Sequence, residues 1–296
     1  MINYENTMEH NSIYKKENKK KFNVKSKFFY FFIYLMAIMT VAALIAIVGF
    51  VLINGLSNID IEFLTQNPRS MGRQGGVYSV ILSTIYLTFL AILISAPIGI
   101  GAAIYFTEYA KDTRLTRLIR YGTEILAGIP SIIFGLFGFA FFVIGLGLRW
   151  SLLSGSLTLS MMILPTLIRS TEESLKTVPN SYREGSLSLG ATKWYTIIKV
   201  VLPSCLSGIL TGLILGIGRA VGETAAVMLT AGSSLGIPMS IMDPARTMSV
   251  HLYILASEGL SQEKTYASAA LLIILVLIIN TVASLITNIY IKKAKA

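Results

Sequence analysis

Long runs of uncharged, largely apolar residues alternate with short polar stretches along the chain. A helix needs about 20 apolar residues to cross the hydrocarbon core of a bilayer, and even the shortest uncharged windows, 150–168 and 200–218, have about that length. Six such windows could not all be buried inside a soluble protein of 296 residues. The pattern predicts an all-α integral membrane protein with six transmembrane helices, near residues 28–53, 77–107, 123–147, 152–169, 200–231 and 267–291.

The composition agrees with this fold class. Hydrophobic residues make up 54% of the chain and charged residues only 14%, and the mean hydropathy is +0.68, whereas soluble domains carry about 25% charged residues. The single cysteine, Cys205, excludes internal disulfide bonds. Neither His10 nor His251 lies near clustered acids or thiols in the sequence, so no metal site is predicted.

Basic residues collect on one side of the predicted helices. The first 27 residues, the 108–122 loop, the 169–199 region and the C-terminal tail hold 19 of the 25 Lys and Arg residues, and the other side holds five. Because an excess of Lys and Arg marks the cytoplasmic side, both termini are predicted to be cytoplasmic. The net charge of +10 then reflects topology and contact with anionic lipid. No nucleic-acid partner is expected, because the basic residues are spread over four separate pieces.

The same pattern divides the chain into five parts. The Lys-rich arm at the start lacks the apolar residues that folding needs and is predicted to be mostly disordered. The first apolar segment is too long for a cleaved signal peptide and is predicted to remain as an anchor. The parts are a basic cytoplasmic N-terminal arm (1–27), a first transmembrane helix (28–53), an external loop (54–76), a core (77–291) with a cytoplasmic loop at about 170–199, and a basic C-terminal tail (292–296).

The fifth predicted helix carries charge inside an apolar segment. Gly208, Gly212 and Gly216 recur every four residues, and at 100° per residue Arg219 and Glu223 are predicted to share their stripe. Charged residues within a membrane span are costly and often mark a substrate path. Two interpretations stay open: a path for substrate, or an ion pair that neutralises itself and locks two helices together.

Arg169 is predicted to close the fourth helix at its cytoplasmic end. An interfacial anchor is the simpler interpretation of such a residue. A guanidinium is also a good bidentate ligand for an oxyanion, so Arg169 is a weaker candidate for the substrate path.

A polar loop follows the fourth predicted helix. Pro179 is expected to end one helical segment, and Ser181 with Glu184 has the form of a capping box for the next. Gly190 then suits a left-handed turn at the end of that helix, and residues 191–199 continue as a second helix. The sequence therefore predicts two short helices at an angle along the cytoplasmic face of the membrane.

This loop resembles the "EAA" loop of the permease subunits of bacterial ABC transporters. That motif reads Glu-Ala-Ala, three residues, Gly, nine residues, Ile, any residue, Leu-Pro. The spacing matches throughout, with Gly, Ser and Val substituted at three positions. In that family the loop docks into a separate ATPase dimer, so the resemblance implies that ATP and Mg are used by a partner and that this chain binds no cofactor. The matching residues are Glu184, Gly185, Ser186, Gly190, Val200, Leu202 and Pro203.

Two further segments, 129–138 and 218–225, resemble permeases of phosphate-specific ABC transporters, of the PstA type rather than the PstC type. The resemblance covers about residues 75–291 and implies the type I ABC importer permease fold. It also implies a PstC-type second permease, a cytoplasmic ATPase dimer, an external phosphate-binding protein and a bacterial plasma membrane. The chain would then be a non-enzymatic permease subunit that imports inorganic phosphate.

Other interpretations of the sequence remain. Within the same family, the substrate could be another oxyanion, such as molybdate or sulfate, or a small organic solute. A self-sufficient secondary transporter or channel is a second class, although six helices are few for one and the loop at 170–199 would have no role. A membrane-embedded enzyme would need a nucleophile with a base or a metal cluster, and Cys205, His10 and His251 do not supply one.

Overall fold

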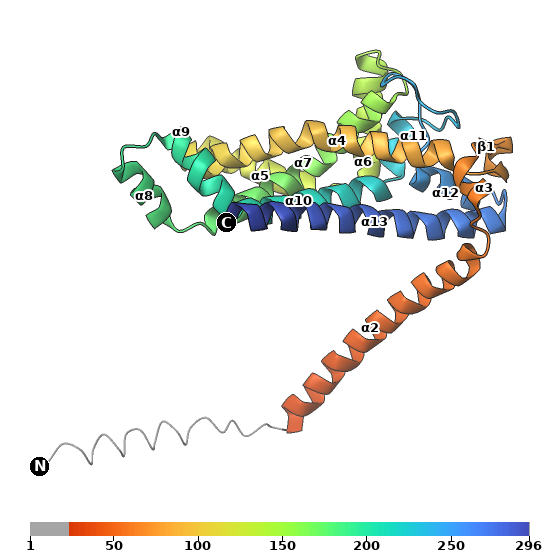
Figure 1. Ribbon diagram of the computed structural model, residues 1–296, viewed down its shortest axis with the longest axis horizontal. Coiled ribbons are helices and arrows are strands. Elements are labelled where there is room, and N and C mark those ends of the chain that lie inside the picture. The colour runs from red at the N-terminus through yellow and green to blue at the C-terminus, as the bar shows by residue number, and fades with distance from the viewer. Residues whose placement is uncertain (1–23, 296) are drawn as a thin grey trace, which may run out of the picture. The chain divides into compact units, whose positions relative to one another are not determined.

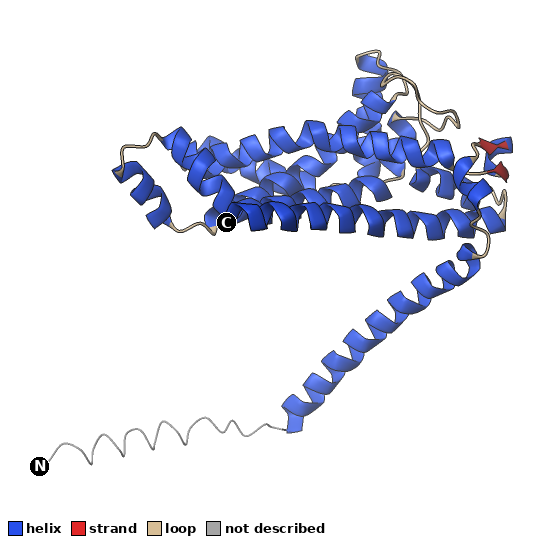
Figure 2. Ribbon diagram, in the orientation of Figure 1, coloured by secondary structure: helices blue, strands red, loops and turns tan. Residues whose placement is uncertain are grey.

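The computed structural model describes the backbone of residues 24–295 and the side chains of residues 29–285 and 287. The predicted N-terminal arm lies largely outside the described residues. Most of the rest is helical (Figures 1 and 2), and the two strands that the described part contains form one short hairpin. The predicted all-α membrane fold is confirmed.

The first predicted transmembrane segment is a single helix. α2 (Val24–Leu56) is 33 residues long, and its apolar part, Phe29–Leu56, covers 28 residues. At about 1.5 Å per residue this length is more than enough to cross a bilayer core of about 30 Å.

Within residues 51–295, four long helices run side by side (Figure 1). α7 packs against both α4 and α10 and is the most buried of the four. Leu159, Ile163 and Leu167 of α7 are fully buried and form a common apolar core with Leu87 of α4. The four helices are α4 (Tyr78–Ile104), α7 (Leu152–Lys176), α10 (Leu202–Gly222) and α13 (Gln262–Lys295).

The third predicted transmembrane segment is bent. α5 (Arg114–Gly128) ends before Pro130, and the helix that follows, Ser131–Gly145, leaves at 105°. Proline has no N–H to donate and disfavours helical geometry in the residue before it, and Ile129 is extended. The one continuous helix predicted near 123–147 is therefore wrong: the apolar segment begins at Arg114 and is broken at Ile129 and Pro130. The second arm of the bend comprises α6 (Ser131–Gly138) and the π-helical η3 (Phe139–Gly145).

The fifth segment differs from the prediction at both ends. One apolar helix runs without a break from Lys193 to Gly222, through α9 (Lys193–Thr196), the π-helical η4 (Ile197–Val201) and α10. Glu223 is extended, with ψ of 131°, and α11 (Ala225–Thr230) is a separate short helix. The predicted helix at 200–231 therefore begins too late and ends too late.

The glycines of α10 bring it close to α7. A Cβ added at Gly212 would lie 2.8 Å from the Cβ of Ser170, and one added at Gly216 would lie 2.8 Å from Cγ2 of Ile163. Ser170 also donates a hydrogen bond of 3.3 Å to the carbonyl of Gly208. The glycine stripe therefore allows α10 to approach α7 closely.

Short elements gather where α13 begins, an end of the bundle that we call the α12 end (Figure 1). They hold the residues of the predicted external loop, and Phe63 there is buried in a cluster with Val77 and Met248. Ser70, Met71 and Gly72 all have positive φ at the hairpin turn. The elements are α3 (Ile61–Thr65), β1 (Pro68–Arg69), η1 (Ser70–Gly72), β2 (Gln74–Gly75) and α12 (Met248–Ser257).

The number of membrane-spanning segments follows from these elements. Five helices in residues 24–295 are long and apolar enough to cross a membrane, and the bent pair Arg114–Gly128 and Ser131–Gly145 makes six if it is counted as one segment. α12, with 10 residues, is too short to cross.

Candidate functional site

The loop with the motif forms a protruding elbow at the other end of the bundle, which we call the α8 end (Figure 1). α7 continues to Lys176, and after Pro179 the chain forms α8 (Asn180–Ser188). Gly190 turns the chain with φ of +83°, as predicted from its position. The second short helix, predicted at 191–199, is not a separate element, because α9 continues directly into α10.

The motif residues of α8 lie partly on the outer surface of this elbow and partly against α9. Glu184 and Gly185 are exposed, and a Cβ added at Gly185 would meet no atom within 4 Å. Ser186 faces inward, and its hydroxyl lies 2.9 Å from that of Thr196. The small residue at position 185 is thus not required by packing within this chain.

The predicted capping box is not formed. α8 begins at Asn180, and the residue before it, Pro179, provides no side-chain cap. Ser181 therefore lies inside the helix, where its hydroxyl cannot act as the N-cap. Among the described residues the carboxylate of Glu184 has no hydrogen-bond or ion-pair partner, while its backbone carbonyl accepts from the hydroxyl of Ser188 at 2.8 Å.

An apolar groove of ≈ 620 Å³ opens between α8 and α9. Leu189 at the end of α8 is 90% exposed, and Tyr182 and Tyr195 are 52% and 55% exposed. Apolar side chains that are this accessible at a helix elbow are typical of a surface for another protein. The groove is lined by Tyr182, Ser186, Leu189, Gly190, Ala191, Thr192, Tyr195 and Val200.

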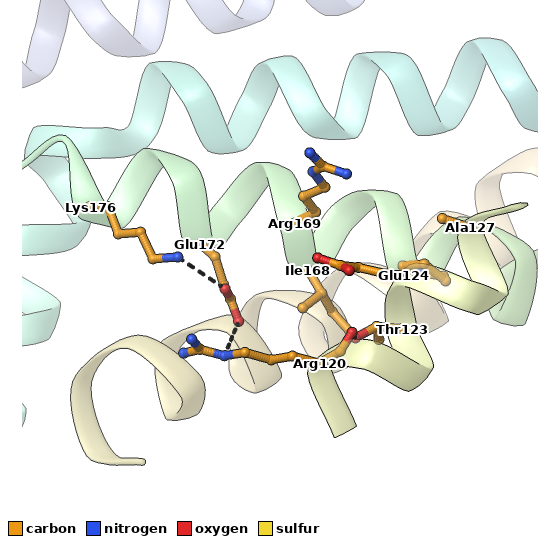
Figure 3. Close-up of a pocket in the computed structure, with 9 residues that line it drawn as sticks. Arg120, Thr123, Glu124, Ala127, Ile168, Arg169, Glu172 and Lys176 are labelled. Atoms are coloured by element: carbon orange, nitrogen blue, oxygen red, sulfur yellow. Dashed lines mark hydrogen bonds and ion pairs between the residues drawn. The ribbon is translucent and has the colours of Figure 1, made fainter. Parts of the chain in front are cut away.

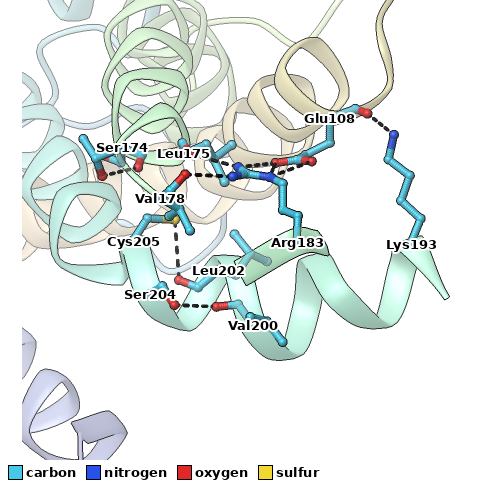
Figure 4. Close-up of polar contacts among 11 residues, drawn as sticks. Glu108, Ser174, Leu175, Val178, Arg183, Lys193, Val200, Leu202, Ser204 and Cys205 are labelled. Atoms are coloured by element: carbon cyan, nitrogen blue, oxygen red, sulfur yellow. Dashed lines mark hydrogen bonds and ion pairs between the residues drawn. The ribbon is translucent and has the colours of Figure 1, made fainter. Parts of the chain in front are cut away.

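The elbow is joined to the bundle by a buried ion pair between Arg183 and Glu108 (Figure 4). The side chains are only 17% and 7% exposed. Nη2 of Arg183 lies 2.7 Å from Oε1 of Glu108, and Nε lies 3.0 Å from the same oxygen. Arg183 also donates to the carbonyls of Val178 at 2.8 Å and Leu175 at 3.1 Å. One guanidinium thus connects α8 to the ends of two other helices.

Lys193 adds a second contact to the same place. Its ammonium donates to the backbone carbonyl of Glu108 and lies 4.6 Å from the ring centroid of Tyr109. Both residues belong to the π-helical η2 (Tyr105–Tyr109), which continues α4 without a break. The sequence showed only that Glu108 ends a long uncharged window, and nothing in it indicated a partner 75 positions away.

Arg219 and Glu223 do not form an ion pair. Arg219 is half-buried near the end of α10, and among the described side chains its guanidinium has no acidic or hydrogen-bonding partner. Because α10 ends at Gly222, Glu223 leaves the helical stripe predicted for it. Its carboxylate instead accepts from the N–H of Ala226 at 3.4 Å, at the start of α11.

Arg169 lies in a cleft of ≈ 190 Å³ between α5 and α7, near the α8 end (Figure 3). Its guanidinium pairs with Glu173 at 3.1 Å, and both side chains are well exposed. On the wall of the cleft, the buried carboxylate of Glu172 lies 3.7 Å from Nε of Arg120 and 3.5 Å from Nζ of Lys176. Three cations, Arg120, Arg169 and Lys176, therefore line this cleft. The sequence did not indicate this arrangement.

Another cation, Arg246, is buried at the α12 end. Arg246 is 4% exposed and donates to the carbonyl of Ser233 at 2.8 Å and to that of Met71 at 3.4 Å. Burial lowers the pKa of Arg246. The first bond closes the loop before α12 on itself and the second ties it to the turn with positive φ, which accounts for Arg246 as a structural residue.

Known proteins with similar sequences share a function in transport. Residues 95–296 match the family model described as "Binding-protein-dependent transport system inner membrane component". The chain is 32% identical over 278 residues to "Probable ABC transporter permease protein YqgI" of Bacillus subtilis, covering 88% of this chain and 95% of the relative. It is 34% identical over 215 residues to "Phosphate transport system permease protein PstA 1" of Mycobacterium tuberculosis, covering 72% and 70%.

Solved structures agree on the fold. A permease of the MetNI methionine ABC transporter aligns with a TM-score of 0.58 at 21% identity, covering 73% of this chain and 94% of that one. A bacterial alginate ABC importer aligns with a TM-score of 0.61 at 15% identity, covering 89% and 97%. The chain is a multi-pass membrane protein that belongs to the family of binding-protein-dependent transport system inner membrane components, the permeases of ABC importers.

Proposed function

We propose that the chain is the PstA-type permease of an ATP-driven importer of inorganic phosphate. Relatives named as phosphate transport system permease proteins PstA are 32–34% identical to it over more than 70% of its length. The segment from Gly218 to Ala225, which resembles phosphate permeases, spans the end of α10 and the start of α11. The observation that carries the anion assignment is Arg219, a cation within an apolar helix and without an acid partner among the described side chains.

An unpaired cation in a membrane segment needs compensation. Placing an arginine at the centre of a bilayer-spanning helix costs about 2.5–3.5 kcal/mol on insertion scales, and the cost is smaller towards a helix end, where Arg219 lies. Water in a path, a group on a second permease, or a passing anion would each lower this cost. Arg219 near the α12 end and Arg169 near the α8 end would then be two binding points for an oxyanion along the path. The negative charge of Glu223, four positions after Arg219, would oppose tight binding of the anion.

The α8 elbow supplies the proposed docking surface for the ATPase dimer. Glu184, Gly185 and Gly190 lie on its exposed side, Ser186 faces Thr196, and Leu202 and Pro203 begin α10. Its exposed groove and the family of the chain support a protein partner there. The α8 end would be cytoplasmic, and the α12 end would face the phosphate-binding protein outside a bacterial plasma membrane. A PstC-type chain would complete the path, and ATP with Mg would be used by the ATPase.

Transport assays in liposomes test this proposal. The permease pair, the ATPase and the binding protein are reconstituted, and uptake of radiolabelled phosphate is measured with ATP inside the liposomes. We expect uptake that needs both ATP and the binding protein and that excess molybdate or sulfate does not reduce. Uptake of molybdate, sulfate or an organic solute in place of phosphate would overturn the substrate assignment. Uptake by this chain alone, driven by an ion gradient, would show a secondary transporter.

A further inference from the structure

Apolar packing does not hold α8 in place. No residue of the helix Asn180–Ser188 is buried, whereas every long helix of the bundle contributes to an apolar core. The connections on either side are short, 177–179 and 189–192. The position of α8 is therefore set by its polar contacts, which are those of Arg183 and the hydroxyl pair of Ser186 and Thr196.

The contacts of Arg183 reach α7, which precedes α8 along the chain, and also η2, which the backbone does not join to α8 directly. All three guanidinium nitrogens are used, two of them on Glu108 and two on the carbonyls of Leu175 and Val178. Breaking a buried ion pair leaves an uncompensated charge and is strongly unfavourable. Glu108 and α8 are thus expected to move together.

Glu108 lies in the last turn of a membrane-spanning helix. The segment Tyr78–Tyr109 is one uninterrupted helix of 32 residues, and its last turn, η2, is π-helical. π-Helical turns are frequent at functional sites. Lys193 bonds to the same turn and lies at the start of the helix Lys193–Gly222. One turn of α4 is therefore bound to both sides of the elbow.

We infer that Glu108, Arg183 and Lys193 form a clasp that transmits displacement of α8 to α4. Its members are positioning residues. The inference rests on the proposed docking of an ATPase at α8. A motor that pulls on α8 would then move the end of α4 through the Arg183–Glu108 pair, and not only α7 and α10 through the backbone. A purely structural tie would stabilise the fold without affecting how ATP hydrolysis is converted into transport.

The test compares uptake of radiolabelled phosphate with ATP hydrolysis in the reconstituted complex. Single neutral variants can misfold because they bury one charge, so the main variant is the double Glu108→Gln/Arg183→Gln, with Arg183→Lys as a milder change. Lysine keeps the charge but lacks the bidentate fork. The matched control is Arg117→Gln, which removes the exposed ion pair of Arg117 with Asp112 at 3.3 Å.

We expect the double variant to retain the ATPase on purification and to hydrolyse ATP. Uptake per ATP should fall about tenfold, within the usual range of coupling between sites. Uptake per ATP should be intermediate in Arg183→Lys, and in Arg117→Gln it should equal that of the unmodified complex. Unchanged uptake per ATP in the double variant, an equal loss in the control, or loss of the ATPase from the complex would each overturn the inference.

Cys205 provides a second readout that does not depend on the substrate. It is the only cysteine of the chain, is 3% exposed, and lies beside the clasp (Figure 4). Opening of the clasp should expose its thiol, so alkylation by a membrane-permeant maleimide should be faster in the double variant during ATP hydrolysis than in the unmodified complex. Equal alkylation rates would overturn the inference. If no complex imports phosphate, the substrate assignment fails, while this thiol measurement still tests the clasp.

Discussion

Arg219 is the residue whose charge matters most to the proposed path. It is half-buried in an apolar helix, and no described acidic side chain neutralises it. The sequence pattern pointed to this residue but placed Glu223 on the same helical stripe, because it continued the helix through Glu223, where the backbone is in fact extended. A periodicity argument holds only as far as the helix does.

Replacing Arg219 tests this role. Arg219→Ala should reduce phosphate uptake by the reconstituted complex about tenfold or more, the loss expected when one charge-assisted hydrogen bond of about 1.5–3 kcal/mol is removed. Arg219→Lys, which keeps the charge, should retain part of the uptake. Expression and co-purification of the ATPase are checked in parallel. Uptake by Arg219→Ala equal to that of the unmodified complex would refute a role in the path.

His251 makes stability depend on pH at the α12 end. Burial, and then the nearby charge of Arg246, lower the pKa of His251 to about 4. The folded state keeps the imidazole neutral while the unfolded state binds a proton below its usual pKa of 6.5. Stability should therefore fall as the pH drops from about 6.5 towards 4.

Thermal unfolding measures this effect. The midpoint for the purified protein in detergent should decrease over that pH range, and the decrease should be smaller in His251→Gln, which cannot titrate. The comparison uses the difference between the two proteins, since carboxylates titrate in both. The same decrease of the thermal midpoint with pH in both proteins would contradict the lowered pKa of His251.

The elements show which features a single sequence can predict. The long uncharged windows predicted where the membrane-spanning segments lie, because a bilayer requires a minimum length of apolar helix. The breaks at Pro130 and Glu223 were missed, since hydropathy does not register a change of backbone direction inside an apolar stretch. The motif located the elbow, but the capping box failed because Pro179 occupies the position before the helix. The Arg183–Glu108 pair depends on a fold that joins distant segments.

The glycine stripe predicts a stability effect at the scale of helices. Gly212→Ala would place a Cβ 2.8 Å from that of Ser170, so α10 and α7 must separate. Overpacking of this kind costs about 1–3 kcal/mol, and the thermal midpoint of the protein in detergent should fall by several degrees. Gly101→Ala on α4 is the matched control, because its added Cβ meets nothing within 4 Å. Equal midpoints for the two variants would contradict the close packing.

At the scale of the whole molecule, the two ends of the bundle are built differently. The α8 end has an exposed elbow held by polar contacts, and the α12 end has a hairpin and loops tied down by a buried arginine. A membrane importer needs such a division, because one end must follow a motor while the other receives the substrate. The α8 end is the one that the family resemblance assigns to the motor.

Site-specific photo-cross-linking tests the docking of the ATPase most directly. A benzophenone amino acid replaces Leu189 at the α8 elbow or, as the control, Met239 in the loop before α12; each residue is 90% exposed. After irradiation of the assembled complex, the position of Leu189 should cross-link to the ATPase and the position of Met239 should not. Cross-linking of the ATPase from position 239, or none from 189 in an active complex, would contradict docking at α8.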